Sequence, residues 1–188
     1  NIINVMSGNF MSMGVRQGSG ASNTLTVEDA LAIRELVPTA QYVAPSVSTR
    51  NQIIAGNQNW QTRIQGTDVE FPLIRSWPVK YGTFFSTQDV TSASKVVVLG
   101  SLVATNLFGE DVDPTGQIVR IKNQPFKVIG VMASKGSGTG GEDQDDTAMV
   151  PYTAAQKKLM GIQHIQGVTV SAASSNLVAD TKAAIEEV

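Results

Sequence analysis

The 188-residue chain contains no cysteine, only one histidine and no long apolar run. Without cysteine it cannot form a disulfide, present a thiolate nucleophile or build a cysteine-based zinc site. A membrane-spanning helix needs about 20 predominantly apolar residues, and no segment of the sequence approaches that length. Aromatic residues make up 6% of the chain and charged residues 16%. The composition therefore excludes disulfides, thiolate chemistry and cysteine-based zinc sites, and it gives no candidate for a membrane-spanning helix.

The composition is that of a globular chain without the electrostatic signature of a nucleic-acid-binding protein. Hydrophobic residues make up 41% of the sequence, and 188 residues can bury a core in one domain or in two small lobes. The formal net charge is −2, whereas a nucleic-acid interface requires clustered lysine and arginine. We therefore expect no nucleic-acid partner.

Motifs of nucleophilic or cofactor chemistry are absent or incomplete. His164 is the only histidine, and one histidine without cysteine cannot form a histidine-rich metal site. No G-x-S-x-G sequence supports a Ser-His-Asp triad. Gly136, Gly138 and Gly141 fit G-x-G-x-x-G, but acidic residues follow where a helix should begin, and they would repel a pyrophosphate. A flexible exposed loop is the better prediction.

Two acidic segments could be mistaken for cation sites. Asp111 and Asp113 resemble the start of a calcium loop, but Lys122 occupies the place of the closing acidic residue, so a tight turn is expected. The Glu142–Asp146 cluster could hold a cation weakly, although clustered charge is ordinarily a solvated loop tip. The sequence therefore assigns no catalytic, cofactor-binding or metal-binding residue, calls for no cofactor, and predicts that the chain is not an enzyme.

The two tryptophans, Trp60 and Trp77, could fill the core or mark a partner surface, because tryptophan is enriched at binding hot spots. Trp60 alternates with polar residues along a predicted strand, which favours the core. Trp77 stands beside Pro78 in a less regular segment, and both interpretations remain open there. Partner-binding residues stay unknown.

The central part of the chain predicts a strand–helix–strand–strand unit. Val96–Leu99 is an unbroken apolar run, as expected of a strand buried on both faces. Ser101 is predicted to cap a helix that ends at Gly109, and Phe108 should pack on the neighbouring strands. The DPTG segment at 113–116 carries turn chemistry, and two further strands are predicted before residue 132.

The remaining elements follow from apolar periodicity and turn signals. Gly8 to Asn23 is predicted to be a loop, and Phe71 to Phe85 to be extended and rich in turns. The predicted strands and helices are, in order, Ile2–Ser7, a helix from Val27 to Val37, Gln41–Arg50, Gln52–Ala55, Trp60–Gln65, Ala148–Tyr152, a helix over Ala154–Met160, Gln166–Ala172 and a last helix from Leu177 to Val188.

In this order, these segments resemble the extracytoplasmic core domain of MacB-type ABC transporter permeases, a group related to FtsX and to lipoprotein-releasing permeases. The motifs VVVLG, LFG, DPTG and FKVIGV occur in the family's order. Leu25–Ala30 resembles the start of the family's first helix, and Met149–Thr153 resembles the strand after its variable loop. The resemblance spans nearly the whole chain.

The resemblance implies an α+β fold with two lobes. A discontinuous α/β porter-like lobe would comprise residues 1–68 and 162–188, and an inserted β-rich sabre-like lobe would comprise residues 69–161. The two ends of the chain should lie on the same, membrane-facing side, with Ile2–Ser7 and Gln166–Ala172 in one lobe. The segment Val96–Val131 should belong to a different sheet from Ile2–Ser7.

The resemblance also implies a function at the bacterial inner membrane, with this domain on the periplasmic or extracellular side. ATP would be hydrolysed on a separate cytoplasmic subunit or domain, and this domain would transmit the conformational change for export. The implied partners are a second permease copy, the ATPase and, in a Gram-negative source, a periplasmic adaptor protein and an outer-membrane channel. The alternatives are an FtsX-like regulatory domain that activates a cell-wall hydrolase or sensor, and a free-standing secreted binding module.

Overall fold

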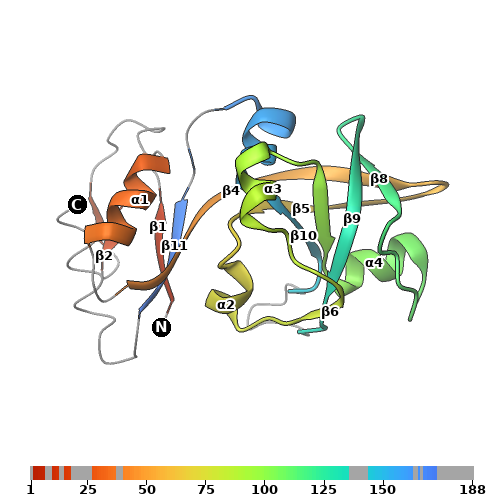
Figure 1. Cartoon of the computed structure of the whole chain (residues 1–188), viewed down its shortest axis with the longest axis horizontal. Coiled ribbons are helices and arrows are strands. Elements are labelled where there is room, and N and C mark those ends of the chain that lie inside the picture. The colour runs from red at the N-terminus through yellow and green to blue at the C-terminus, as the bar shows by residue number, and fades with distance from the viewer. Residues whose placement is uncertain are drawn as a thin grey trace.

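The computed structural model describes residues 2–6, 10–12, 15–17, 27–36, 40–135, 144–162, 165 and 167–172. Over these residues the chain is a mixed α/β structure in which strands predominate. Figure 1 shows a smaller group of elements, with α1, β1 and β11, at one end and a larger, β-rich group at the other. The strand β4 runs between the two groups.

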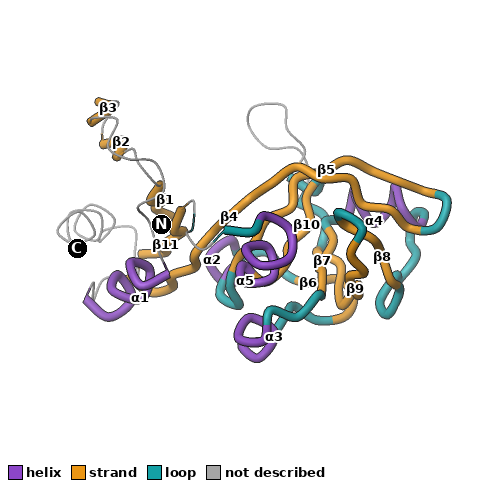
Figure 2. Tube along the Cα trace, turned by 90° about the horizontal axis from the view of Figure 1, so that it is seen from above, coloured by secondary structure: helices purple, strands orange, loops and turns teal. Residues whose placement is uncertain are grey.

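Strand β4 (Ala40–Ala55) is one continuous strand of 16 residues where the sequence predicted two. Its first part, up to Ser46, pairs antiparallel with β11 (Gly167–Ala172). From Val47 onward it pairs antiparallel with β5 (Gln58–Thr67). The change of partner therefore falls within a single strand, and Figure 2 shows β4 extending across both groups of elements.

The first and last described strands lie side by side at the smaller end of the molecule. Strand β1 (Ile2–Met6) pairs antiparallel with β11, with Ile2 opposite Ser171. These two segments, which were expected in one lobe, are neighbours in one sheet. The last predicted helix, from Leu177 to Val188, lies outside the described residues.

Helix α1 (Val27–Leu36) packs against β4 and buries Ala30 and Ile33. This is the helix that the apolar periodicity predicted. The loop prediction for Gly8 to Asn23 is wrong in part, because β2 (Phe10–Ser12) and β3 (Val15–Gln17) form an antiparallel pair. The paired segments are only three residues long, too short for an alternating pattern to be recognised.

The larger end contains five further strands beside β4 and β5. In sheet order β5 is followed by β10, β7, β9 and β6, while β8 pairs with β4 and β9. The pairs β5–β10 and β7–β9 are parallel, and the others are antiparallel. The bounds are β6 (Val79–Gly82), β7 (Val96–Leu99), β8 (Ile118–Ile121), β9 (Gln124–Met132) and β10 (Thr147–Pro151).

Val96–Val131 and Ile2–Ser7 were expected in different sheets, and their hydrogen-bonded connection runs through β4, whose first part pairs with β11 and whose second part pairs with β5. An unbroken path of paired strands runs from β1 through β11, β4, β5 and β10 to β7 and β9. The physical reason is the length of β4, which is sufficient to pair with β11 at one end and with β5 at the other. The two-lobe description is therefore not confirmed.

Parts of β4 and β5 pair with strands that come from within the 69–161 segment. Arg63 on β5 is opposite Thr147 on β10, and Ile53 on β4 is opposite Ile121 on β8. Ile53 belongs to the same buried cluster as Phe126 on β9, and both side chains are fully buried. Packing thus joins the β4–β5 hairpin to the larger group of elements.

Five short helical segments complete the larger end: α2 (Phe71–Arg75), α3 (Thr87–Ser92), α4 (Ser101–Phe108), α5 (Tyr152–Ala154) and the π-helix η1 (Ala155–Met160). Helix α4 was predicted, but its N-cap is Gly100 and not Ser101. Helix α2 lies where an extended segment was expected. None of the described helices is long and apolar enough to cross a membrane.

Two clusters of buried side chains hold the larger end together. The main cluster surrounds Phe126, and Trp60 and Phe108 are half-buried and pack against it. The second cluster contains Phe71, Trp77 and five other residues. Trp77 is only 5% exposed, so the question that its sequence context left open is decided in favour of the core.

Candidate functional site

A solvent-accessible pocket of about 720 Å³ lies beside the β4–β5 hairpin. Its walls come from β4 and β5, from α2 and the residues just after it, from the chain after β9 and from the chain that enters β10. Four of its lining residues are basic. The residues that define its chemistry are Arg50, Arg63, Arg75, Lys135, Trp77 and Asp146, and we call it the basic pocket.

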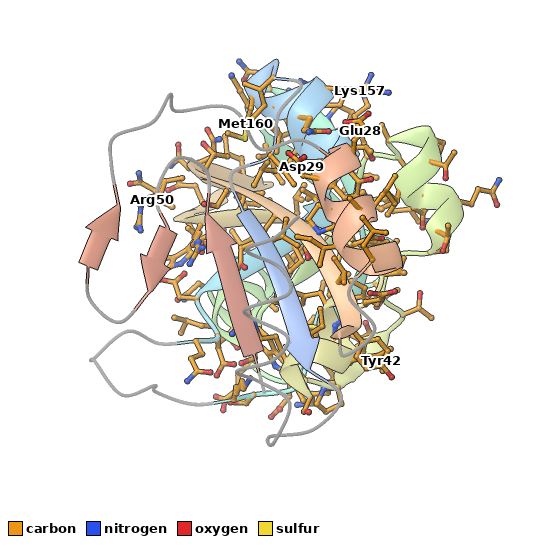
Figure 3. All side chains as sticks on the ribbon, turned by 90° about the vertical axis from the view of Figure 1, so that its left-hand side faces the viewer. Glu28, Asp29, Tyr42, Arg50, Lys157 and Met160 are labelled. Carbon is orange, nitrogen blue, oxygen red and sulfur yellow. The ribbon has the colours of Figure 1, made fainter. Side chains whose placement is uncertain are left out.

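Arg50 and Arg63 stand directly opposite each other in the antiparallel pair of β4 and β5. Exposure alternates along β4, with Ile53 buried and its neighbours Gln52 and Ile54 exposed. Since side chains two residues apart share a face, Arg50 projects from the exposed face with them. Figure 3 shows Arg50 on the side of the molecule away from α1. Like charges directly opposite in a sheet repel each other.

Arg75 is the last residue of α2 and is half-buried at the edge of the pocket. Its guanidinium carbon lies 5.9 Å from the centre of the Phe71 ring, within the range of a cation–π contact. Burial, and secondly the charge of Arg63, lower the pKa of Arg75. Helix α2 is anchored to β4, because a carboxylate oxygen of Glu70 accepts a hydrogen bond from the amide of Val43 at 2.7 Å.

Lys135 follows β9 and crosses toward α2. Its Nζ donates a hydrogen bond to the carbonyl oxygen of Arg75 at 3.2 Å and lies 5.2 Å from the centre of the Trp77 ring. The indole N–H of Trp77 in turn donates to the carbonyl of Ala133 at 2.7 Å. Burial is the main cause that lowers the pKa of Lys135; Arg75 lowers it further and Asp145 opposes the shift.

Two carboxylates near the pocket are engaged with other groups. Asp145 is 3% exposed and accepts hydrogen bonds from the amide of Lys135 and from the hydroxyl of Ser134, at 2.8 and 3.0 Å. One oxygen of Asp146 accepts from Trp60 Nε1 at 2.9 Å and from Thr62 Oγ1 at 2.7 Å. For these two residues the prediction of a solvated loop tip is wrong, because they fix the chain that enters β10.

The remaining predicted sites divide between described and undescribed parts of the chain. The tight turn at residues 113–116 is present: Asp113 Oδ1 accepts hydrogen bonds from the amide and the hydroxyl of Thr115, which lower the pKa of Asp113. No group of three or more acidic or histidine residues suited to a metal ion occurs among the described residues. The glycines at 136–141, the acidic residues at 142 and 143, and His164 lie outside those residues.

Chemically, the basic pocket is suited to holding an anion. Within the described part of the chain, no carboxylate forms an ion pair with Arg50, Arg63 or Arg75. The sequence did not reveal this site, because successive members of its four cations are separated by 12 to 60 positions along the chain and only pairing and packing bring them together. The single local signal is the alternation of polar and apolar side chains along β4 and β5. It would have revealed the Arg50–Arg63 pair only if the register of the hairpin had been known.

Comparison with known proteins gives a family match over the full chain. The sequence model described as "MacB-like periplasmic core domain" matches residues 1–188. The chain is 39% identical over 162 residues to the pyoverdine export ATP-binding/permease protein PvdT of Pseudomonas entomophila, covering 86% of this chain and 25% of that protein. It is 41% identical over 174 residues to the macrolide export ATP-binding/permease protein MacB of Syntrophobacter fumaroxidans, covering 92% and 24%. It thus spans about a quarter of these relatives.

Two solved structures share the fold. The periplasmic region of MacB from Actinobacillus actinomycetemcomitans superposes with a TM-score of 0.81 at 23% identity, covering 100% of this chain and 81% of the other. The extracellular domain of the noncanonic ABC-type transporter YknZ from Gram-positive bacteria superposes with a TM-score of 0.73 at 20% identity, covering 95% and 88%. At these identities the likeness concerns the fold alone.

Proposed function

The chain belongs to the MacB-like periplasmic core domain family, and on this premise we propose that it transmits ATP-driven conformational change from an ABC transporter in the inner membrane to the periplasm. In this proposal the ATPase is a separate part of the longer protein, and a second permease copy moves in concert. A periplasmic adaptor and an outer-membrane channel receive the exported cargo. The domain itself performs no chemistry.

The observation that supports this role is the continuity of β4. Six of its residues between Ala40 and Ser46 pair with β11, and the residues from Val47 to Ala55 pair with β5. A strand held by hydrogen-bonded neighbours along its length is stiff, so a displacement of the smaller end is passed to the larger end. The Glu70–Val43 hydrogen bond adds a second connection, between α2 and the first part of β4.

The proposal places the membrane on the side of β1 and β11. Ile2 and Ser171 are paired neighbours, so membrane helices attached before β1 and after β11 would act on the same small region. Movement of these helices would rotate that region, and β4 would carry the rotation to the larger end as a rigid-body change.

An insertion experiment in the full-length transporter tests this coupling. We would insert Gly-Ser-Gly-Ser between Ser46 and Val47, where β4 changes partner. Because this sequence is flexible, export should be lost while ATP hydrolysis by the transporter continues. The matched control is the same insertion between Gly56 and Asn57, in the exposed turn of the hairpin. Export that survives both insertions equally would refute the lever role, provided that both variants reach wild-type membrane levels.

Export is preferred over the FtsX-like regulatory alternative and the secreted module because the relatives are named as export permeases. The two relatives are named for different cargoes, so the proposal concerns the shared coupling role and not one cargo. The neighbours of the parent gene provide a direct check. An adaptor gene beside it favours export, and a hydrolase or sensor gene favours regulation.

A further inference from the structure

The basic pocket is a feature that mechanical coupling does not require. Stiffness arises from strand pairing, whereas the pocket gathers Arg50, Arg63, Arg75 and Lys135 around one concave surface. Arg50 and Arg63 occupy directly opposed positions, where like charges are destabilising. Where a chain departs from its own stabilising rules, function is the usual reason.

The cations at the inner edge of the pocket are held in place. Lys135 is exposed, but its ammonium donates a hydrogen bond to the carbonyl of Arg75 and lies over the face of Trp77, which is itself anchored to Ala133. Arg75 lies against Phe71. Phe71 and Trp77 are buried members of the second core cluster. Positively charged groups supported by a packed core lose less conformational entropy when a ligand binds.

In the described lining of the pocket, cations outnumber carboxylates, of which Asp146 is one. Asp146 accepts hydrogen bonds from Trp60 and Thr62. Burial and Arg63 act on Arg75 in the same direction, and no carboxylate offsets them. Asp145, which opposes the lowering of the pKa of Lys135, accepts hydrogen bonds from the amide of Lys135 and from the hydroxyl of Ser134. Among the described lining residues, four cations against one carboxylate leave a surplus of positive charge.

We propose that the basic pocket binds a small polyanion that carries at least two carboxylate or phosphate groups. Arginine guanidinium groups bind both kinds of oxyanion through paired hydrogen bonds, and the three arginines with Lys135 can accept more than one such group. The pocket volume of about 720 Å³ lies within the range of roughly 300 to 1,000 Å³ that is usual for small-molecule sites. Its concave shape favours a small molecule over an acidic protein segment.

Calorimetric titration of the 188-residue chain with pyrophosphate and, separately, with citrate tests the proposal at low ionic strength. We expect saturable binding at one site, and the affinity should fall as salt screens the charges. Tighter binding of pyrophosphate would assign the site to phosphates, and tighter binding of citrate to carboxylates. Arg75→Gln and Lys135→Gln should each weaken binding by about tenfold or more, as loss of a charged hydrogen bond predicts.

The matched control is Arg120→Gln, which removes the same charge from an exposed position on β8 that does not line the pocket. Arg75→Lys keeps the charge but loses the paired hydrogen bonds, so it should bind more weakly than wild type and more tightly than Arg75→Gln. The melting temperature of each variant is measured first and must lie well above the titration temperature, so that every variant is folded when its binding is compared. Failure of both probes to saturate, equal losses for Arg120→Gln and Arg75→Gln, or tighter binding of an oligoglutamate peptide than of either probe would overturn the proposal.

Discussion

Arg50 and Arg63 face each other across the antiparallel pair of β4 and β5, and no carboxylate within the described residues forms an ion pair with either. This arrangement has an energetic consequence that does not depend on any ligand. Replacing one partner removes the repulsion, so a variant of the pair should be more stable than the wild-type chain.

We predict that Arg63→Thr raises the free energy of unfolding by roughly 0.2 to 1 kcal/mol, the range for cross-strand pairs. The gain should shrink at high salt, because screening weakens the repulsion in the wild type. Urea unfolding at two salt concentrations measures both effects. Arg120→Thr is the control, since Arg120 is opposite Ile54 and Pro125 and no arginine. Equal changes in the two variants would mean that strand propensity, and not charge, is responsible.

Phe126 and Phe108 provide a prediction about packing. Phe126 is fully buried on β9, whereas Phe108 at the end of α4 is half-buried. Phe126→Ala should destabilise the chain by about 3 to 5 kcal/mol, and Phe108→Ala should cost distinctly less. Thermal and urea unfolding of the two variants measure the difference. A loss at Phe108 as large as that at Phe126 would contradict this ranking.

The local elements of the fold were predictable where a short-range pattern decides them. Val96–Leu99 is β7, as its apolar run indicated, and Val119 and Ile121 are buried on β8 while Ile118 is 56% exposed, as their alternation indicated. These elements depend on neighbours within a few residues and on turn residues such as Gly116, whose φ is 94°.

The longer-range features were not predictable for physical reasons. The break predicted in β4 falls at Asn51, where polar residues interrupt the apolar pattern, but pairing with β5 carries the strand through it. Helix α3 has six residues and depends on a capping box between Ser86 and Asp89 that compensates for its short length. The basic pocket unites side chains from separate elements, and charge alone does not indicate which of 14 basic residues converge.

Asp146 should be important for the structure around Trp60. Its Oδ1 accepts hydrogen bonds from Trp60 Nε1 and Thr62 Oγ1, and Thr62 is fully buried. Asp146→Ala should cost about 1.5 to 3 kcal/mol, because it leaves the buried hydroxyl of Thr62 and the half-buried indole of Trp60 without a charged acceptor. Asp146→Asn keeps one carbonyl oxygen and should cost less.

The emission of Trp60 provides the measurement for these variants. In a Trp77→Phe background, emission from Trp60 should shift to longer wavelength in Asp146→Ala, as the indole loses its partner and gains water. Urea unfolding gives the stabilities. Unchanged emission together with unchanged stability would show that the two hydrogen bonds contribute nothing measurable in solution.

Gly100 is predicted to tolerate no side chain. A Cβ atom at this position would lie 2.2 Å from the carbonyl oxygen of Asp145 and 2.8 Å from that of Thr147, both backbone atoms. Gly100→Ala must therefore displace the chain that enters β10, and it should cost more than the roughly 1 to 2 kcal/mol of an ordinary left-handed position. Gly56→Ala is the control, since Gly56 has a φ of +58° and open space around it. Urea unfolding should rank Gly100→Ala clearly below Gly56→Ala, and the reverse order would contradict the prediction.

Lys135 links the charge of the basic pocket to pH. Partial burial and the neighbouring Arg75 lower its pKa below the ordinary value of 10.5, while Asp145 opposes the shift; the ammonium lies over the ring of Trp77. Between the lowered pKa and 10.5 the unfolded chain binds more protons than the folded chain. Stability should therefore rise with pH across that window. Anion binding should show the opposite trend, because loss of the proton removes a positive charge from the pocket.

The difference between the wild type and Lys135→Gln isolates the contribution of this group from that of every other titratable group. Stability from urea unfolding, taken as wild type minus variant, should increase between neutral pH and pH 10.5. The difference in citrate or pyrophosphate affinity between the wild type and Lys135→Gln should decrease over the same pH range. A stability difference that stays flat with pH would mean that the neighbours of Lys135 do not perturb its charge. An affinity difference that stays flat would mean that Lys135 does not contact the anion.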